Sequence, residues 1–263
     1  MRIMVDIYKV TEFLDKYLGV QNFEDIDIVV NGLEIEGSQE IEKAIFAVSL
    51  TERVVDICIE ENCNAIFLHH GILLRGSRGS EIILKTIRGS FRRILKKILQ
   101  NDINIIAYHL PLDAHPEIGN NITIAKILNL TNIEWIPEKR GPPIGIVGEL
   151  ENERDREEIL KIVKERINEK SVLLPHGPEK VKKIAIVSGA GSEYVYRFRR
   201  GEIDLLLTGE VKESCEVYAI NEGINIIVAG HYHTELVGMR NLSKIVCSRF
   251  SISTMVVEER QNI

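Results

Sequence analysis

The sequence has few of the features that mark secreted or membrane-bound proteins. Its 263 residues contain four cysteines and no C-x-x-C pair, which argues against a disulfide framework. No stretch reaches eighteen consecutive apolar residues, and the first twenty residues mix charged and apolar side chains at helical spacing. We therefore expect neither a signal peptide nor a membrane span, and a reduced, cytoplasmic setting.

An excess of positive charge is also missing. The chain carries 33 Lys and Arg against 39 Asp and Glu, a net charge of −6 and a pI near 5.7. A dedicated nucleic-acid coat protein needs a positive global field, so this class is disfavoured. With 44% hydrophobic residues the chain can bury a sizeable core, which excludes intrinsic disorder.

Short Ile- and Val-rich runs alternate with charged segments of helical periodicity, which is typical of an α/β protein with buried strands. Helices are predicted over 51–61, 90–99 and 154–168. Strands are predicted over 43–49, 65–69, 104–108, 183–188, 204–208, 225–229 and 251–258.

An internal duplication is indicated by two similar strands, KAIFAVS at 43–49 and KKIAIVS at 182–188. INIIAYH at 103–109 likewise matches INIIVAGH at 224–231. We predict two similar α/β halves, residues 1–130 and 131–263, with their boundary in the Pro- and Gly-rich stretch 135–150. Chance similarity between Ile/Val-rich strands is the alternative.

Polar residues follow the repeated strands in the same order in both halves. The first half reads His109-x-x-x-Asp113 and the second reads His231-x-x-x-Glu235. In α/β proteins the carboxyl ends of strands carry the sites, and imidazole with carboxylate suits a divalent transition metal. His69 and His70 end another strand, and both can serve one site if the backbone turns at Gly71.

This set of three or four imidazoles and two carboxylates exceeds the ligands of a single zinc ion. It predicts two divalent ions bridged by a carboxylate. A lone histidine at a strand end is more often structural, but five of the seven histidines cluster at such ends: His69, His70, His109, His231 and His233. His115 and His176 lie in loop sequences and are interpreted as incidental.

A basic segment follows His70. Residues 71–100 hold one acidic residue, Glu81, and eight basic ones: Arg75, Arg78, Lys85, Arg88, Arg92, Arg93, Lys96 and Lys97. Such a segment attracts phosphate or another anion, although a solvated helix face explains it equally well. Residues 189–192, Gly-Ala-Gly-Ser, lack the Lys of a P-loop and are interpreted as a turn.

Several strings resemble the Nif-three-like family, catalogued as GTP cyclohydrolase one type two homologues, in its short bacterial and archaeal form. They are VNGLEIEG (30–37), FLHHG (67–71), YHLPLDAHPEIGNN (108–121), LLTGEV (206–211) and AGHYHTE (229–235). The resemblance implies two divalent ions in a cleft between two α/β halves, and rings built as a homohexamer, a trimer of dimers. The implied metal ligands are His69, His70, Asp113, His231 and Glu235, with His109 beside them.

The functional hypothesis is a metal-dependent hydrolase acting on a nucleotide-like or other phosphorylated small molecule. His109 and Glu210 are the candidate acid/base residues. The metal can be zinc, iron, manganese, nickel or cobalt, because imidazole and carboxylate accept all five. Two alternatives are a non-enzymatic metal carrier or storage ring, and a ring that binds nucleic acid through Arg75 to Lys97 and takes part in handling damaged nucleotides.

Overall fold

The computed structural model describes residues 4–75, 82–83 and 86–259, which fall into two compact units. The first unit comprises the chain up to Leu112 together with Met239 onward, and the second comprises Asp113–Gly238. The sequence placed one boundary at residue 130. The chain instead passes between the units twice, because residues after Leu112 pack in the second unit and the C-terminal segment returns to the first sheet.

Among its described residues, the first unit contains four helices, a 3₁₀ turn and most of the last helix. The helical elements are α1 (Ile7–Leu18), η1 (Val20–Asn22), α2 (Glu52–Glu60), α3 (Gly89–Gln100), α4 (Leu110–Asp113) and α8 (His231–Phe250). The last residue of α4 belongs to the second unit, and α8 enters the first unit at Met239. The strands are β1 (Val5–Asp6), β2 (Gly32–Ile35), β3 (Glu40–Ile41), β4 (Lys43–Ser49), β5 (Ala65–His70), β6 (Leu74–Arg75), β7 (Ile82–Ile83), β8 (Asn104–Ala107) and β15 (Ser253–Val256).

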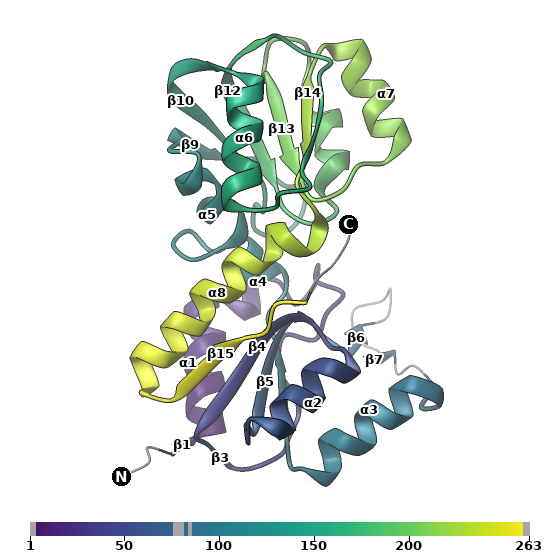
Figure 1. Cartoon of the computed structure of the whole chain (residues 1–263), viewed down its shortest axis with the longest axis vertical. Coiled ribbons are helices and arrows are strands. Elements are labelled where there is room, and N and C mark those ends of the chain that lie inside the picture. Colours follow the sequence, from purple (N-terminus) through teal and green to yellow (C-terminus); the bar gives the residue numbers. More distant parts are fainter. Residues whose placement is uncertain (1–3, 76–81, 84–85, 260–263) are drawn as a thin grey trace. The chain divides into compact units, whose positions relative to one another are not determined.

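Five of these strands form the main sheet of the first unit, in the order β15-β4-β5-β8-β2. Figure 1 shows β15, β4 and β5 side by side. The first four strands in this order run parallel and β2 is antiparallel to β8. Helices α2 and α3 cover one face, where Val54, Cys58 and Ile98 pack on alternate strand residues. Tyr108 points to the other face and donates to Asp15 of α1. The sheet is therefore buried on both sides, as its continuous apolar strands predict.

The second unit has the same mixed character. Its helical elements are α5 (Asn120–Ile127), α6 (Arg156–Arg166), η2 (Gly191–Arg197), α7 (Glu213–Glu222) and the first turns of α8. Its strands are β9 (Thr131–Trp135), β10 (Ile146–Asp155), β11 (Val172–Leu174), β12 (Lys180–Val187), β13 (Leu205–Thr208) and β14 (Asn225–Val228).

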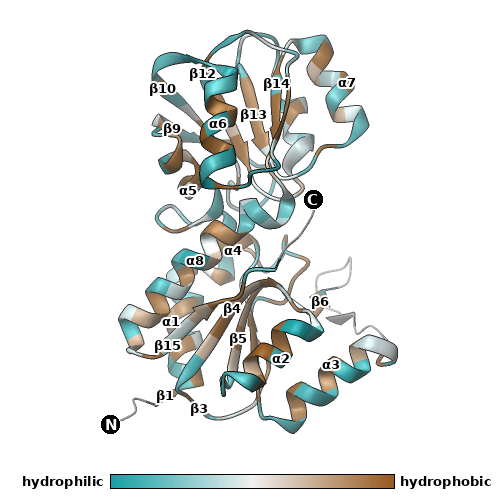
Figure 2. Cartoon of the chain, in the orientation of Figure 1, coloured by the Kyte–Doolittle hydropathy of each residue, from teal (hydrophilic) through white to brown (hydrophobic). Residues whose placement is uncertain are grey.

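The sheet of the second unit runs β11-β14-β13-β12-β10-β9, with β12, β13 and β14 parallel. Helices α5 and α6 pack on one face, whereas η2 and α7 pack on the other. In each unit the central strands, such as β5 and β13, are mainly hydrophobic, whereas the helices carry both hydrophobic and hydrophilic residues (Figure 2). Both sheets thus centre on three parallel strands followed by polar residues, an arrangement compatible with the predicted duplication.

The Pro- and Gly-rich stretch 135–150 is not the boundary that the sequence indicated. It joins β9 to β10, which pair antiparallel within one sheet. Two of its glycines are tightly packed, since a methyl group on Gly145 would lie 2.8 Å from Val187 Cγ2 and one on Gly148 would lie 3.0 Å from Leu130 Cβ. Composition alone does not distinguish such tightly packed glycines from those of a linker.

Membrane spans were not expected from the sequence. Across the residues described above, no helix is both long and apolar enough to cross a bilayer.

Candidate metal centre

Three histidines gather at the carboxyl end of the first sheet. His69 and His70 end β5, and His109 follows β8, its parallel neighbour. One ring nitrogen of each lies within 4.8 Å of those of the other two. The three histidines lie close together because β5 and β8 are adjacent parallel strands, whose carboxyl ends meet at one edge of the sheet.

Hydrogen bonds to Nδ1 determine which ring nitrogen of His69 and of His109 keeps its lone pair. His69 Nδ1 lies 3.0 Å from the carbonyl oxygen of Tyr108, and His109 Nδ1 lies 2.8 Å from Oδ1 of Asp27. Carbonyl and carboxylate oxygens only accept, so both Nδ1 atoms carry the proton and both Nε2 atoms keep a lone pair. This is the arrangement typical of metal-binding histidines. His70 Nδ1 is 2.9 Å from Ser49 Oγ.

Asp27 holds the loop around His109. Its buried carboxylate also accepts from the backbone N–H of Val29 and Leu110 and from the side chain of Asn31. Burial alone raises the pKa of Asp27, but these hydrogen bonds and the one from His109 outweigh it, so the pKa is lowered. Asp27 is therefore an anion that fixes the tautomer and direction of His109.

A second, partly buried carboxylate shapes the turn after His70. Glu34 of β2 accepts from the backbone N–H of Ile72 at 2.8 Å and of Leu73 at 2.9 Å. A methyl group on Gly71 would collide with its Oε1 atom, so glycine is needed where the chain passes. Burial raises the pKa of Glu34 to about 7 despite these hydrogen bonds.

The raised pKa of Glu34 predicts a pH-dependent stability. The folded-state pKa of about 7 lies above the reference value of 4.5, so the folded protein binds the proton more tightly and loses stability as pH rises through 7. Between pH 5 and 8 the loss from this group is on the order of 2 kcal/mol. Urea unfolding of metal-free protein should show it, and Glu34→Gln should remove it. An equal pH dependence in both proteins would contradict the prediction.

In the second unit, His231 and Glu235 lie one turn apart on the first two turns of α8. His231 Nε2 is 2.9 Å from Glu235 Oε1, and its Nδ1 is 3.3 Å from Oε2 of Glu210. The sequence placed both residues at a strand end, whereas they lie in the helix that follows β14. Helical spacing of four residues is what brings them to one face. Glu235 is buried and Glu210 is half-exposed.

Asp113 lies in the second unit, close to the same loop as Glu235. Its Oδ1 accepts from Asn120 Nδ2 at 2.7 Å and from Ser188 Oγ at 3.0 Å. Gly189, which follows Ser188 in the chain, has φ +60°, and a methyl group on it would collide with Glu235 Oε1. Asp113 and Glu235 therefore lie against consecutive residues, Ser188 and Gly189. The predicted turn at 189–192 is confined to its first two residues, because Gly191 and Ser192 begin η2.

The pair formed by His231 and Glu235 predicts a strongly basic imidazole in metal-free protein. The hydrogen bond to Glu235 is the main cause, and with the one to Glu210 it overcomes partial burial and raises the pKa of His231 to about 9. The imidazolium stabilises the fold fully below pH 6.5 and this stabilisation is lost as pH rises through 9. Metal must displace the proton, so affinity should increase with pH over this range.

NMR titration of the His231 ring in metal-free protein checks this expectation. The midpoint should lie near pH 9 in the wild type, and Glu235→Gln should lower it by at least about one pH unit because the carboxylate is removed. An unchanged midpoint in Glu235→Gln would refute the assigned cause.

The remaining histidines play other parts. His115 is buried and its Nδ1 accepts from the backbone N–H of Glu117 and Ile118, so it shapes a turn. The ring of His233 packs edge-on against Tyr232. His176 remains in a loop, as predicted.

Part of the basic segment is neutralised locally. Lys97 Nζ lies 2.5 Å from Asp56 and 3.1 Å from Glu52, and Arg93 also pairs with Glu52. These contacts join α3 to α2. Arg88, Arg92 and Lys96 are exposed, whereas Arg78, Glu81 and Lys85 lie outside the described residues.

Sequence reasoning missed Asp27, Glu34, Asn120 and Ser188. Glu34 lies within the string 30–37 and Asn120 within 108–121, so these strings contained them without indicating a role. No spacing pattern pointed to Asp27 or Ser188, because each acts across a long stretch of chain.

Comparisons with known proteins cover almost the entire chain. Residues 5–263 match the family model described as DUF34/NIF3 (NGG1p interacting factor 3). A protein of Pyrococcus abyssi named GTP cyclohydrolase 1 type 2 homolog is 33% identical over 251 residues, covering 95% of this chain and 96% of that protein. A protein of Escherichia coli with the same name is 33% identical over 219 residues, 83% of this chain and 84% of its own length.

Solved structures show the same fold. One described as protein ybgI, of unknown function, superposes with a TM-score of 0.89 at 28% identity, covering 98% of this chain and 100% of that one. TTHA1606 from Thermus thermophilus gives a TM-score of 0.82 at 28% identity, with the same coverage.

Proposed function

Because the chain belongs to the DUF34/NIF3 family, we propose that it binds two divalent metal ions and hydrolyses a nucleotide-like or other phosphorylated small molecule. The proposed ligands are His69, His70, Asp113, His231 and Glu235. The observation that carries the proposal is the cluster of three imidazole nitrogens within 4.8 Å at the end of the first sheet. Zinc, iron, manganese, nickel and cobalt all suit this donor set.

The donor set supports a metal in each unit. In the first, His69 presents Nε2 because its Nδ1 donates to the carbonyl oxygen of Tyr108, and His70 follows it in β5. In the second, a histidine and two carboxylates surround the turn at Ser188 and Gly189. We propose that both sets serve one dinuclear centre, supported by chain connectivity: His109 and Asp113 are four residues apart across the first passage between the units.

Divalent ions would supply Lewis acidity and lower the pKa of bound water. The chain's own groups would handle protons. His109 offers its Nε2 lone pair as a base, held in direction by Asp27. Glu210 is half-exposed beside His231 Nδ1, where it can exchange protons with solvent. The exposed Arg88, Arg92 and Lys96 of the first unit would attract the anionic end of a substrate.

Reconstitution tests the proposal. Protein stripped with a chelator is reloaded with each metal, its content is measured, and a nucleotide panel that includes GTP is assayed with and without chelator. We expect two ions per chain and metal-dependent turnover of one substrate class. His69→Gln should lower metal content, whereas the matched variant His176→Gln, in a loop pairing with Glu216, should not. Full occupancy in His69→Gln would refute the site.

A metal carrier is the second candidate, favoured by the ion pair of His231 and Glu235, which can re-form when metal leaves. It predicts that His109→Gln and Glu210→Gln keep normal metal content and that no turnover is lost. A nucleic-acid-binding ring, favoured by the exposed cations of α3, predicts binding that survives chelation and weakens steeply with salt.

We also propose a homohexameric ring in the cytoplasm. The ring rests on family membership, and native mass measurement tests it. The location rests on the four cysteines, which are all free thiols, three of them buried.

A further inference from the structure

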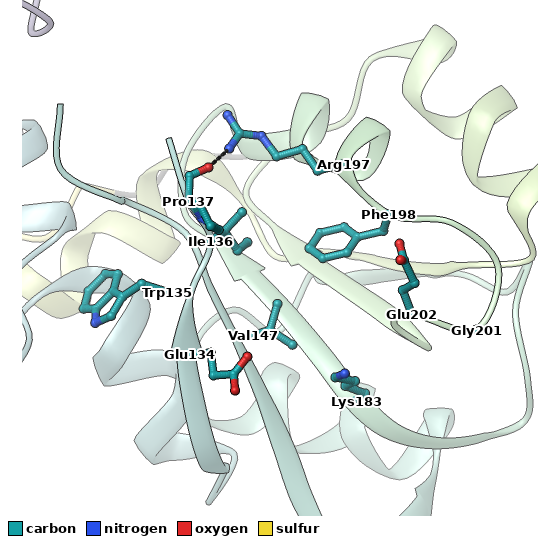
Figure 3. Close-up of a pocket in the computed structure, with 10 residues that line it drawn as sticks. All are labelled: Glu134, Trp135, Ile136, Pro137, Val147, Lys183, Arg197, Phe198, Gly201 and Glu202. Carbon is teal, nitrogen blue, oxygen red and sulfur yellow. Dashed lines mark hydrogen bonds between the residues drawn. The ribbon is translucent and has the colours of Figure 1, made fainter. Parts of the chain in front are cut away.

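The second unit has a cavity of about 600 Å³ beside β9, β10 and β12 (Figure 3). None of the candidate metal ligands lines it. Its volume is in the range of sites for small organic molecules. The cavity is therefore a candidate ligand site separate from the candidate metal centre.

The cavity exists because the covering elements do not reach the edge of the sheet. Helix α7 and η2 pack on the face formed by β12, β13 and β14. Val147 of β10 and Ile136, just after β9, extend this face toward the edge, and Phe198 at the end of η2 forms the opposite wall. Trp135 points the other way, into the core shared with α5 and α6. An apolar floor with one aromatic wall results.

Two opposite charges flank this floor. Glu134 pairs in register with Val147, and Val147 with Ala185, so Lys183 and Glu134 project from the same face on either side of β10. Both are exposed, and within the described part of the chain neither forms an ion pair. Two strand spacings and a two-residue offset along the strand place their backbones roughly 12 Å apart, a gap that their long side chains can narrow.

The other charged groups of the lining are already engaged. Arg197 pairs with Glu138 at 2.6 Å and donates to the carbonyl of Pro137. Glu202 accepts from the backbone N–H of Arg199 at 2.7 Å. One cation and one anion thus remain to bind a ligand, with apolar surface between them.

We propose that this cavity binds a free α-amino acid with a large apolar side chain. The carboxylate would pair with Lys183, the ammonium with Glu134, and the side chain would pack on Val147 and Phe198. A polyanion such as a nucleoside triphosphate is disfavoured because Glu134 and Glu202 repel it. A glycine-sized ligand is disfavoured because it leaves the floor uncovered.

Calorimetry on the full chain tests the proposal with four ligands that differ by one group. L-phenylalanine has all three groups, phenylpropionate lacks the ammonium, phenethylamine lacks the carboxylate, and glycine lacks the ring. We expect L-phenylalanine to bind about five- to tenfold more tightly than each of the others, as single partly exposed charge pairs allow. Backbone amide shifts at Val147 and Phe198 locate the binding.

Two surface variants test which ligand group pairs with Lys183 and which pairs with Glu134. Lys183→Gln should remove the advantage of L-phenylalanine over phenethylamine, and Glu134→Gln its advantage over phenylpropionate. Both side chains are exposed, so the fold and the metal content should be unchanged. The proposal is overturned if phenethylamine or phenylpropionate binds wild-type protein as tightly as L-phenylalanine. It is equally overturned if binding ignores both substitutions.

Discussion

Asp27→Asn is expected to lower metal-dependent turnover by roughly 100-fold or more, the usual contribution of a positioned general base, because Asp27 holds His109 in the tautomer that offers Nε2. Each oxygen of Asp27 accepts two hydrogen bonds: Oδ1 from His109 and Val29, Oδ2 from Leu110 and Asn31. In the substituted side chain, an amide nitrogen replaces one of these oxygens and cannot accept the two hydrogen bonds that the oxygen accepted. If it faces His109, the ring must move its proton to Nε2 and can no longer offer that lone pair.

The same substitution should lower the free energy of unfolding by about 1 to 3 kcal/mol, because it leaves buried donors without an acceptor. Turnover of the metal-loaded protein, compared at equal metal content, measures the first effect, and urea unfolding of metal-free protein measures the second. Asp25→Asn is a matched control, two residues away and exposed. If both variants turn over substrate like the wild type, Asp27 does not position His109 as a base.

Gly209→Ala is expected to be among the most damaging single-methyl additions in the second unit. The new Cβ atom would lie 2.6 Å from the carbonyl oxygen of Gly189 and 2.6 Å from Cα of His231. Both obstacles are backbone atoms, so neither can move aside by changing rotamer. The start of α8 must shift, with an unfolding penalty of about 3 kcal/mol.

Displacement of α8 should also separate His231 from Glu235 and Glu210, because all three meet at this turn. The high pKa of His231 should therefore fall in Gly209→Ala, as NMR titration would show. Gly201→Ala is the control: its φ is +86° but nothing lies within 4 Å of the new methyl group. We expect only a backbone cost near ~1 kcal/mol there. Equal stability of the two variants would contradict the steric explanation.

The gathering of three candidate site histidines could be predicted because the α/β topology places the ends of neighbouring parallel strands together. Apolar runs predict strands, parallel strands share a carboxyl edge, and so His69, His70 and His109 were expected to meet. Their supporting residues could not be predicted. Asp27 and His109 are separated by 82 positions and Ser188 and Asp113 by 75, and no periodicity relates residues so far apart.

The amino-acid sequence by itself determined the α/β class, the principal strands, the histidine and carboxylate inventory and the family. These depend on short-range patterns of apolar and polar residues and on contiguous strings. Tertiary structure decided that Asp113 belongs to the second unit, that 135–150 joins two paired strands, and which imidazole nitrogens are offered to a ligand. Those outcomes depend on which distant backbone and side-chain atoms come within hydrogen-bonding or van der Waals distance, and this is fixed only when the sheets assemble.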